Sequence, residues 1–272
     1  MLKFAVNHMT VARASYAQLL DIASELDCIG VEVRNDLPQT LFDGHSPEKA
    51  GDMARETGLR ILAISEIKRF NDWNDDRKAE ALELIGIAKL AGAEAVSLIP
   101  RNDNGGMGNG ERQANLRVAL REMGPILQDN GMTGLVEPLG FETCALRHKQ
   151  EAVEAIEGLG MSGTFKLVHD TFHHHLARGG TVFAAHTGMA HISGVVDPAL
   201  STSEMADENR ILVDSRDRLG NIEQLNQLRA AGYDGPVSFE AFAEAVHADE
   251  NPVAALRQSM EFIRSGMADM AA

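Results

Sequence analysis

The sequence predicts an α/β protein that forms a single closed (β/α)8 barrel, the TIM barrel fold. Eight short apolar runs alternate with segments of helical periodicity, and their length and flanking glycines are typical of parallel strands buried on both faces. A length of 272 residues and a hydrophobic content of 44% suffice for one sizeable core. Several runs end in polar residues, and such a barrel keeps its chemistry at the C-terminal ends of its strands.

The eight strand candidates are distributed over the whole chain. In order they are Leu2–Val6, Cys28–Val33, Leu59–Ile64, Ala93–Ile99, Thr133–Glu137, Phe165–Asp170, Met189–Val196 and Gly235–Glu240. No Pro/Ser-rich or charge-dense linker divides the chain between them. We therefore expect one domain over residues 1–272.

Segments of helical periodicity separate the strand candidates. Ala14–Leu26 and Asp75–Leu90 both carry apolar residues at helical spacing. In the second segment we expect Ala79, Leu82 and Leu90 to lie on the apolar stripe that covers the sheet from outside. The alternation of strands and helices is that of a repeated βα unit, without a repeat in the sequence.

Proline and glycine mark helix boundaries. The helix predicted over Glu111–Gln128 contains Pro125, which should kink or split it because proline lacks a backbone N–H. Glycine accepts the positive φ that often ends a helix. We expect that role for Gly58, Gly92, Gly131 and Gly232.

A doubly wound open sheet is the main alternative fold. It usually carries a glycine-rich phosphate turn directly after its first strand, where this chain reads Asn7-His8-Met9-Thr10. The glycine-rich segment at 102–110 lies between the fourth strand and a helix, but it matches neither a dinucleotide fingerprint nor a P-loop. We expect it to form a mobile loop over the barrel mouth.

Composition argues against several classes of protein. The formal net charge of −15 and the pI of about 5.1 disfavour nucleic acid as a partner, because duplex binding draws on clustered Lys and Arg. Cys28 and Cys144 are the only cysteines, which gives no disulfide framework and favours a cytoplasmic protein. No signal peptide and no run of eighteen apolar residues is visible, so we expect no membrane partner.

Four residues at or near the ends of strand candidates indicate a metal site. They are Glu137, Asp170, His191 and Glu240. A charge at the end of an apolar run costs several kcal/mol unless it is paired or metal-bound. Three carboxylates and one imidazole suit one divalent metal ion, which could be Mn²⁺, Mg²⁺, Co²⁺ or Zn²⁺. For His191, a hydrogen-bonded core histidine is the alternative.

A run of histidines follows the sixth strand. Neighbouring residues on a strand or helix point in different directions, so few of them can face one site. We expect His173, three residues beyond Asp170, to face it. For His169, His174 and His175, packing or solvent exposure is the expected role.

Three more residues are candidates for contact with a substrate. Asn7 and His8 end the first strand, where they would line the pocket. Arg210 lies in the long connection between the last two strands. It either reaches in to hold a substrate oxygen or belongs to a solvated charged loop.

At these positions the chain resembles the xylose isomerase-like barrel superfamily (the AP endonuclease family 2 type). That superfamily includes ketose 3-epimerases, inosose isomerases and dehydratases, and endonuclease IV. The second half of the chain is most similar to the inosose isomerase branch, which acts in inositol catabolism. The segments that carry the resemblance are Glu137-Pro-Leu-Gly-Phe, Asp170-Thr-Phe-His173-His, Ala190-His191-Ile-Ser and Ser238-Phe-Glu240-Ala-Phe.

The resemblance implies roles for individual residues. Glu137, Asp170, His191 and Glu240 would be the metal ligands, and His173 and Arg210 would contact substrate. Two departures from the superfamily bear on these roles. Glu142 is offset from the glutamate that ketose epimerases carry after the strand-five ligand. The early histidine ligands of endonuclease IV are also missing, and the chain has Glu32, Arg34 and Glu66 in that region.

The implied activity is that of a metal-dependent isomerase or epimerase of a keto-polyol or ketose, with an inosose (2-keto-myo-inositol) as the first candidate. Such reactions remove a proton next to a carbonyl, and a cation stabilises the resulting enediolate. Glu137 and Glu240 are predicted to remove and return that proton.

Other functions remain compatible with the sequence. An inosose dehydratase or a ketose 3-epimerase would use the same barrel and the same intermediate. A metal-free sugar-binding barrel would keep the fold but lose a ligand, and endonuclease activity is disfavoured by the acidity of the chain. Substrate stereochemistry, the physiological metal and the oligomeric state, a homo-oligomer included, stay open.

Overall fold

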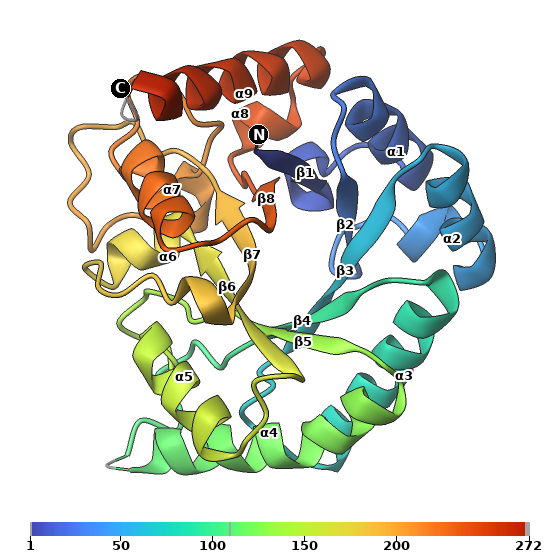
Figure 1. Ribbon diagram of the computed structural model, residues 1–272, viewed down its shortest axis with the longest axis vertical. Coiled ribbons are helices and arrows are strands. Elements are labelled where there is room, and N and C mark those ends of the chain that lie inside the picture. The colour runs from blue at the N-terminus through green and yellow to red at the C-terminus, as the bar shows by residue number, and fades with distance from the viewer. Residues whose placement is uncertain (1, 109, 270–272) are drawn as a thin grey trace.

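Eight parallel strands close into a barrel in the computed structural model, which describes residues 2–108 and 110–269 (Figure 1). Each strand pairs with its neighbours in chain order, and the last pairs with the first. The predicted closed (β/α)8 barrel is therefore confirmed. The strands are β1 (Lys3–Asn7), β2 (Gly30–Arg34), β3 (Arg60–Lys68), β4 (Ala95–Ile99), β5 (Thr133–Val136), β6 (Phe165–Asp170), β7 (Thr187–Ile192) and β8 (Pro236–Phe239).

Helices surround the strands in a ring (Figure 1). The α-helices are α1 (Tyr16–Glu25), α2 (Pro47–Glu56), α3 (Asp75–Ala91), α4 (Glu111–Asp129), α5 (Lys149–Gly158), α6 (Thr171–Leu176), α7 (Asn221–Ala230), α8 (Glu244–His247) and α9 (Pro252–Asp269). Short segments of 3-10 helix lie in the loops of the described chain: η1 (His8–Val11), η2 (Leu41–Gly44), η3 (Ala184–His186) and η4 (Asp207–Asn209). The connection between β7 and α7, which contains η4, is the longest between consecutive elements named above, so it can extend over the end of the barrel.

Local sequence fixes several helix ends. Ser15 and Gln18 form a capping box at the start of α1, and the Asn74 side chain accepts the Arg77 N–H at the start of α3. The four glycines predicted to end helices all have positive φ, as expected: Gly58, Gly92, Gly131 and Gly232.

The predicted buried face of α3 is wrong. Leu82 and Leu90 are 49% and 55% exposed, and Ala79 is exposed as well. The face that packs on the barrel consists of small and branched residues at helical spacing: Ala81, Leu84, Ile85, Ala88 and Ala91. Two overlapping apolar stripes run along this helix, and only contact with the sheet decides which one is buried.

Proline does not split α4. The helix continues from Glu111 to Asp129 with Pro125 inside it, so the predicted break into two pieces is wrong. Pro125 lies on the exposed side of the helix. Water can therefore bind the carbonyl group four residues earlier, which loses its N–H donor to proline.

Strand alternation directs the candidate site residues into the barrel. Leu135, Val168 and Met189 belong to a small buried cluster contributed by the strands. Side chains two residues apart on a strand share a face. Two residues beyond these three lie Glu137, Asp170 and His191. The intervening residues Val136 and Ala190 pack instead in the main core under the helices.

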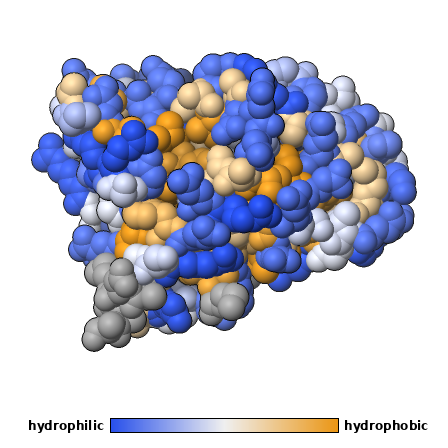
Figure 2. All heavy atoms as spheres, turned by 90° about the horizontal axis from the view of Figure 1, so that it is seen from above, coloured by the Kyte–Doolittle hydropathy of each residue, from blue (hydrophilic) through white to orange (hydrophobic). Residues whose placement is uncertain are grey.

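Hydrophilic residues cover most of the face in Figure 2, with apolar residues visible between them. Over the residues that the structure describes, no helix combines the length and apolar character needed to cross a membrane.

Close packing of β2 against β3 makes Gly30 a sensitive position. A Cβ there would collide with the backbone oxygen of Arg60, whereas a Cβ at Gly86 in α3 would have no atom within 4 Å. We expect Gly30→Ala to lower the free energy of unfolding by about 1–3 kcal/mol. Gly86→Ala, the matched control, should raise it by about 0.5–1 kcal/mol. Urea unfolding followed by circular dichroism measures both, and equal effects would contradict the close approach of the two strands.

Candidate functional site

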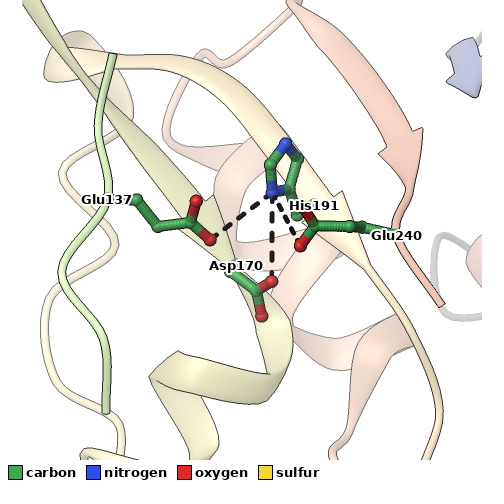
Figure 3. A group of neighbouring side chains, drawn as sticks. All are labelled: Glu137, Asp170, His191 and Glu240. Atoms are coloured by element: carbon green, nitrogen blue, oxygen red, sulfur yellow. Dashed lines mark ion pairs between the residues drawn. The ribbon is translucent and has the colours of Figure 1, made fainter. Parts of the chain in front are cut away.

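Four side chains from four different strands meet inside the barrel mouth. Glu137 follows β5, Asp170 ends β6, His191 lies near the end of β7, and Glu240 follows β8. One ligand-type atom from each residue lies within 4.8 Å of the others, and all four residues are buried. Figure 3 shows the three carboxylates pointing toward one nitrogen of the His191 ring. The structure thus brings together the four residues predicted as metal ligands.

The imidazole of His191 lies at the centre of this group. Its Nδ1 is 3.2 Å from Glu240 Oε2, 3.4 Å from Glu137 Oε1 and 4.0 Å from Asp170 Oδ2. Among the residues that the structure describes, neither Nδ1 nor Glu137 Oε1 has a hydrogen-bond partner, although both atoms are buried. Buried polar atoms without partners are rare unless an ion or water binds them. Three carboxylate oxygens and an imidazole nitrogen around one point fit a divalent cation.

Glu32 holds the other nitrogen of the same ring. His191 Nε2 lies 3.0 Å from Glu32 Oε2, and the side chain of Glu32 is completely buried. A neutral imidazole that donates from Nε2 presents a lone pair at Nδ1, the nitrogen that faces the carboxylates. Sequence reasoning gave Glu32 no role in the site. The available signal was its position two residues before Arg34 on a strand whose residues are all buried.

Arg210 closes the group from the β7–α7 connection. Its Nη2 donates to Asp170 Oδ2 at 2.6 Å and to Glu240 Oε2 at 2.9 Å, and its Nε donates to Ser193 Oγ at 2.9 Å. The guanidinium carbon lies 4.9 Å from the ring centre of Phe172 and 4.6 Å from that of Phe242. The structure therefore places this predicted substrate residue among the carboxylates, not in a solvated loop.

Arg34 is a second buried cation that sequence reasoning did not assign to the site. It makes a two-pronged contact with Asp36 at 2.7 and 2.8 Å. It also donates to Glu240 Oε1 at 3.0 Å and to Glu66 Oε2 at 3.3 Å. Lys68 extends the network, since its Nζ is 3.1 Å from Glu66 Oε1. A line of paired charges therefore runs from Glu240 to the ends of β2 and β3.

Burial and charged neighbours shift the pKa values of Glu137 and Glu240 in opposite directions. Burial raises the pKa of Glu137 to about 7, against the attraction of His191. Burial also pushes the pKa of Glu240 upward, but His191, Arg210 and Arg34 outweigh it and hold that pKa well below the usual range. The pKa of His191 is raised by Glu240, Glu32 and Glu137 in spite of burial. Two carboxylates with opposite shifts suit acid–base chemistry.

The other predicted substrate residues have different surroundings. Asn7 is buried, and its Nδ2 donates to Glu240 Oε1 at 3.2 Å. His173 is buried beside the ring of Phe141 and lines the cavity at the barrel mouth. His8 does not line that cavity, because its Nε2 lies 2.9 Å from the carbonyl oxygen of Ala14.

A cavity of about 230 Å³ lies above the carboxylates. Its lining combines Glu137, Glu240, His173 and Arg210 with residues at the ends of β2 and β3, Asn102 of the glycine-rich segment, Phe141 and Phe242. Polar groups that converge in a hollow beside aromatic rings are typical of a small-molecule site. Glu142 contributes nothing to it, because its side chain is 72% exposed.

The buried pairs of Arg210 yield a stability prediction. Arg210→Met removes one buried positive charge and the donor that Asp170 Oδ2 and Glu240 Oε2 share, which should lower the free energy of unfolding by about 3–5 kcal/mol in the presence of a chelator. Arg216 is the control, since its pair with Asp214 is exposed and Arg216→Met should change little. Chemical denaturation of both variants provides the comparison. Equal effects would mean that Arg210 does not neutralise the buried carboxylates.

Comparisons with known proteins agree with this architecture. Among curated proteins, none matches the sequence significantly. A xylose isomerase domain-containing protein of Salmonella typhimurium LT2 is 28% identical and superposes with a TM-score of 0.88, over 98% of this chain and 97% of that one. The IolI protein, solved with a bound zinc atom, is 18% identical with a TM-score of 0.85 over 97% of this chain and 98% of its own.

A D-psicose 3-epimerase of Clostridium cellulolyticum H10, solved with D-tagatose, has the same fold. It is 15% identical, with a TM-score of 0.74 over 98% of this chain and 99% of its own. The sequence model of the xylose isomerase-like TIM barrel family matches residues 20–266. Since that match extends over most of the barrel, the chain belongs to the xylose isomerase-like TIM barrel family.

Proposed function

We propose that the protein is a metal-dependent isomerase or epimerase of an uncharged keto-polyol, with an inosose as the first candidate. The observation that carries the proposal is the meeting of Glu137, Asp170, His191 and Glu240 around buried atoms without hydrogen-bond partners among the described residues, beside a small cavity that Glu137 and Glu240 line. Family membership and sugar epimerases among the proteins of the same fold support the reaction class.

A divalent metal ion is the proposed cofactor. Glu137, Asp170, His191 and Glu240 would hold it, with Glu32 keeping the proton of His191 on Nε2. When bound, the ion supplies positive charge opposite the oxygen that becomes negative during proton removal. The zinc atom of the IolI protein supports a metal in this fold, and the ligand set is equally compatible with Mn²⁺, Mg²⁺ or Co²⁺.

Glu137 and Glu240 are the proposed acid–base pair. They come from β5 and β8, and both line the cavity. Removal of a proton from the carbon beside a carbonyl gives an enediolate, and return of a proton to the other carbon or the other face completes isomerisation or epimerisation. One glutamate removes the proton and the other returns it, each contributing roughly 10²- to 10⁴-fold.

The charge balance of the cavity favours a neutral substrate. Arg34 is paired with Asp36 and Glu240, Lys68 with Glu66, and Arg210 with Asp170 and Glu240. A phosphate or carboxylate on the substrate would have to displace one of these carboxylates from its partner. Hydroxyl groups can instead donate to the carboxylates and accept from the same cations.

A ketose 3-epimerase is the second candidate, because proteins of that activity share the fold. An inosose dehydratase would use the same proton removal and then expel a hydroxyl group. A sugar-binding barrel without catalysis is disfavoured by the complete set of four candidate ligands. His173 and Arg210 would contact the substrate, and Asn7 would act through Glu240.

Product analysis tests the proposed function. The protein is treated with chelator, supplied with Mn²⁺, and incubated in D₂O with inososes and ketohexoses. NMR should report exchange of the proton beside the carbonyl, together with a new isomer. The phosphate esters of the same ketoses are the matched comparison and should react at least tenfold more slowly. A dehydrated product would select the dehydratase, and absence of exchange with every neutral substrate would reject the proposal.

Asp170→Asn tests the metal site. Replacing a carboxylate by an amide removes charge from the ligand set but little volume, so metal affinity should fall by at least tenfold. Glu142→Gln, at an exposed position, is the control. Calorimetric titration with Mn²⁺ and Zn²⁺ measures both variants, and unchanged affinity and stoichiometry in Asp170→Asn would make the assignment wrong.

Glutamine variants test the acid–base pair. Glu137→Gln and Glu240→Gln keep a ligand oxygen but remove the basic carboxylate, so turnover should fall by about 10²-fold or more while much of the metal occupancy remains. Turnover, metal content and deuterium uptake are measured at saturating metal. If both variants exchange the substrate proton at the parent rate, neither glutamate is the base.

A further inference from the structure

A second cavity lies between α5 and the segment that follows β6. Its volume is about 180 Å³, and its lining includes Lys149, His174, Thr181 and Phe183. Asp170 and His173 also line it, whereas Glu137 and Glu240 do not. The second cavity therefore borders the proposed metal site on the side of Asp170, and Lys149 has no part in the proposed proton transfer.

Lys149 has an unusual partner at this cavity. Its Nζ lies 2.6 Å from Nδ1 of His169, and the ion pairs of the described residues include none with Lys149. His169 is completely buried, and its Nε2 lies 3.0 Å from Gln224 Oε1. The amide nitrogen of Gln224 donates to the carbonyl oxygens of Thr171 and Leu219.

These contacts determine the direction of the hydrogen bonds. The Oε1 of Gln224 can only accept, so Nε2 of His169 must carry the ring proton. Nδ1 of a neutral His169 is then an acceptor, and the Lys149 amine donates to it. A neutral amine that donates one hydrogen in this way keeps its lone pair free for a molecule in the cavity.

Burial disfavours the protonated form of the amine. Burial lowers the pKa of Lys149 to about 7, against the attraction of Asp170. His169 contacts the amine, and the other titratable or charged groups that line the cavity are Asp170 on β6, His173 and His174 on α6, and Arg147 and His148 before α5. His174 is 7% exposed, and no described residue forms a hydrogen bond with its Nδ1, so a polar ligand in the cavity has a second group to bind.

We propose that Lys149 is a nucleophilic lysine that captures a small aldehyde or ketone in the second cavity as an imine. The amine nitrogen bonds to the carbonyl carbon, and both amine hydrogens leave with the carbonyl oxygen as water. The step needs no oxidant or reductant. A desolvated amine beside other basic groups is the setting in which lysine forms such bonds.

Reductive trapping tests the proposal on the full-length protein. Glycolaldehyde and cyanoborohydride are added at pH 7, and peptide mass spectrometry follows each lysine separately. Lys149 should be modified at least ten times faster than Lys166, whose amine lies at the surface of the same region and donates to Ala185 O. The rate at Lys149 should level off above about pH 7, whereas the rate at Lys166 should rise through pH 9.

Variants supply the controls. Lys149→Met and Lys149→Arg should both lose the fast adduct, and Lys166→Met should retain it. Equal rates at Lys149 and Lys166 in the unmodified protein, or a Lys149 rate that rises through pH 9 like that of Lys166, would overturn the proposal. Because the site-resolved rates come from the parent protein, this test stands even if a variant fails to fold. The result is independent of the proposed isomerase activity.

Discussion

The site depends on holding several carboxylates close together where water cannot screen them. Glu137, Asp170 and Glu240 meet inside the barrel mouth, and Glu32 is buried beside the same imidazole. Mutual repulsion and the loss of hydration would expel such a group from an apolar interior. Two arginines and one histidine balance it. The positions of Arg34, His191 and Arg210 are therefore conditions for the barrel mouth to fold as observed, as well as parts of its chemistry.

This balance explains why a loop residue is as buried as the core. Arg210 lies between the rings of Phe172 and Phe242, and an antiparallel bridge between Gly194 and Ile211 fixes the backbone beside it. The long β7–α7 connection is thereby tied to the strand ends at its middle. A guanidinium held by rings and carboxylates on several sides adopts one geometry, so the connection contributes a fixed donor to the cavity wall and not a mobile one.

Much of the fold was predictable because it depends on local pattern. Apolar runs bounded by glycine located all eight strands within a few residues, and the polar residues at or near the ends of these runs located the four candidate ligands. The errors came from tertiary contacts. Leu82 and Leu90 are as apolar as the residues that α3 buries, and Pro125 is tolerated only because its side of α4 faces water. Glu32 and Arg34 were not assigned to the site because their partners lie about 160 and 200 residues away in sequence.

The two halves of the barrel contribute different kinds of residues to the site. All four candidate ligands come from β5 to β8, whereas β1 and β2 supply Asn7, Glu32 and Arg34, which only touch those ligands. The second half thus supplies the proposed ligands, and the first half sets their electrostatic environment. Sequence change in β1 and β2 can retune proton affinity and substrate preference while the ligand set stays intact. In such a barrel, the ligand set and its electrostatic environment can change independently during evolution.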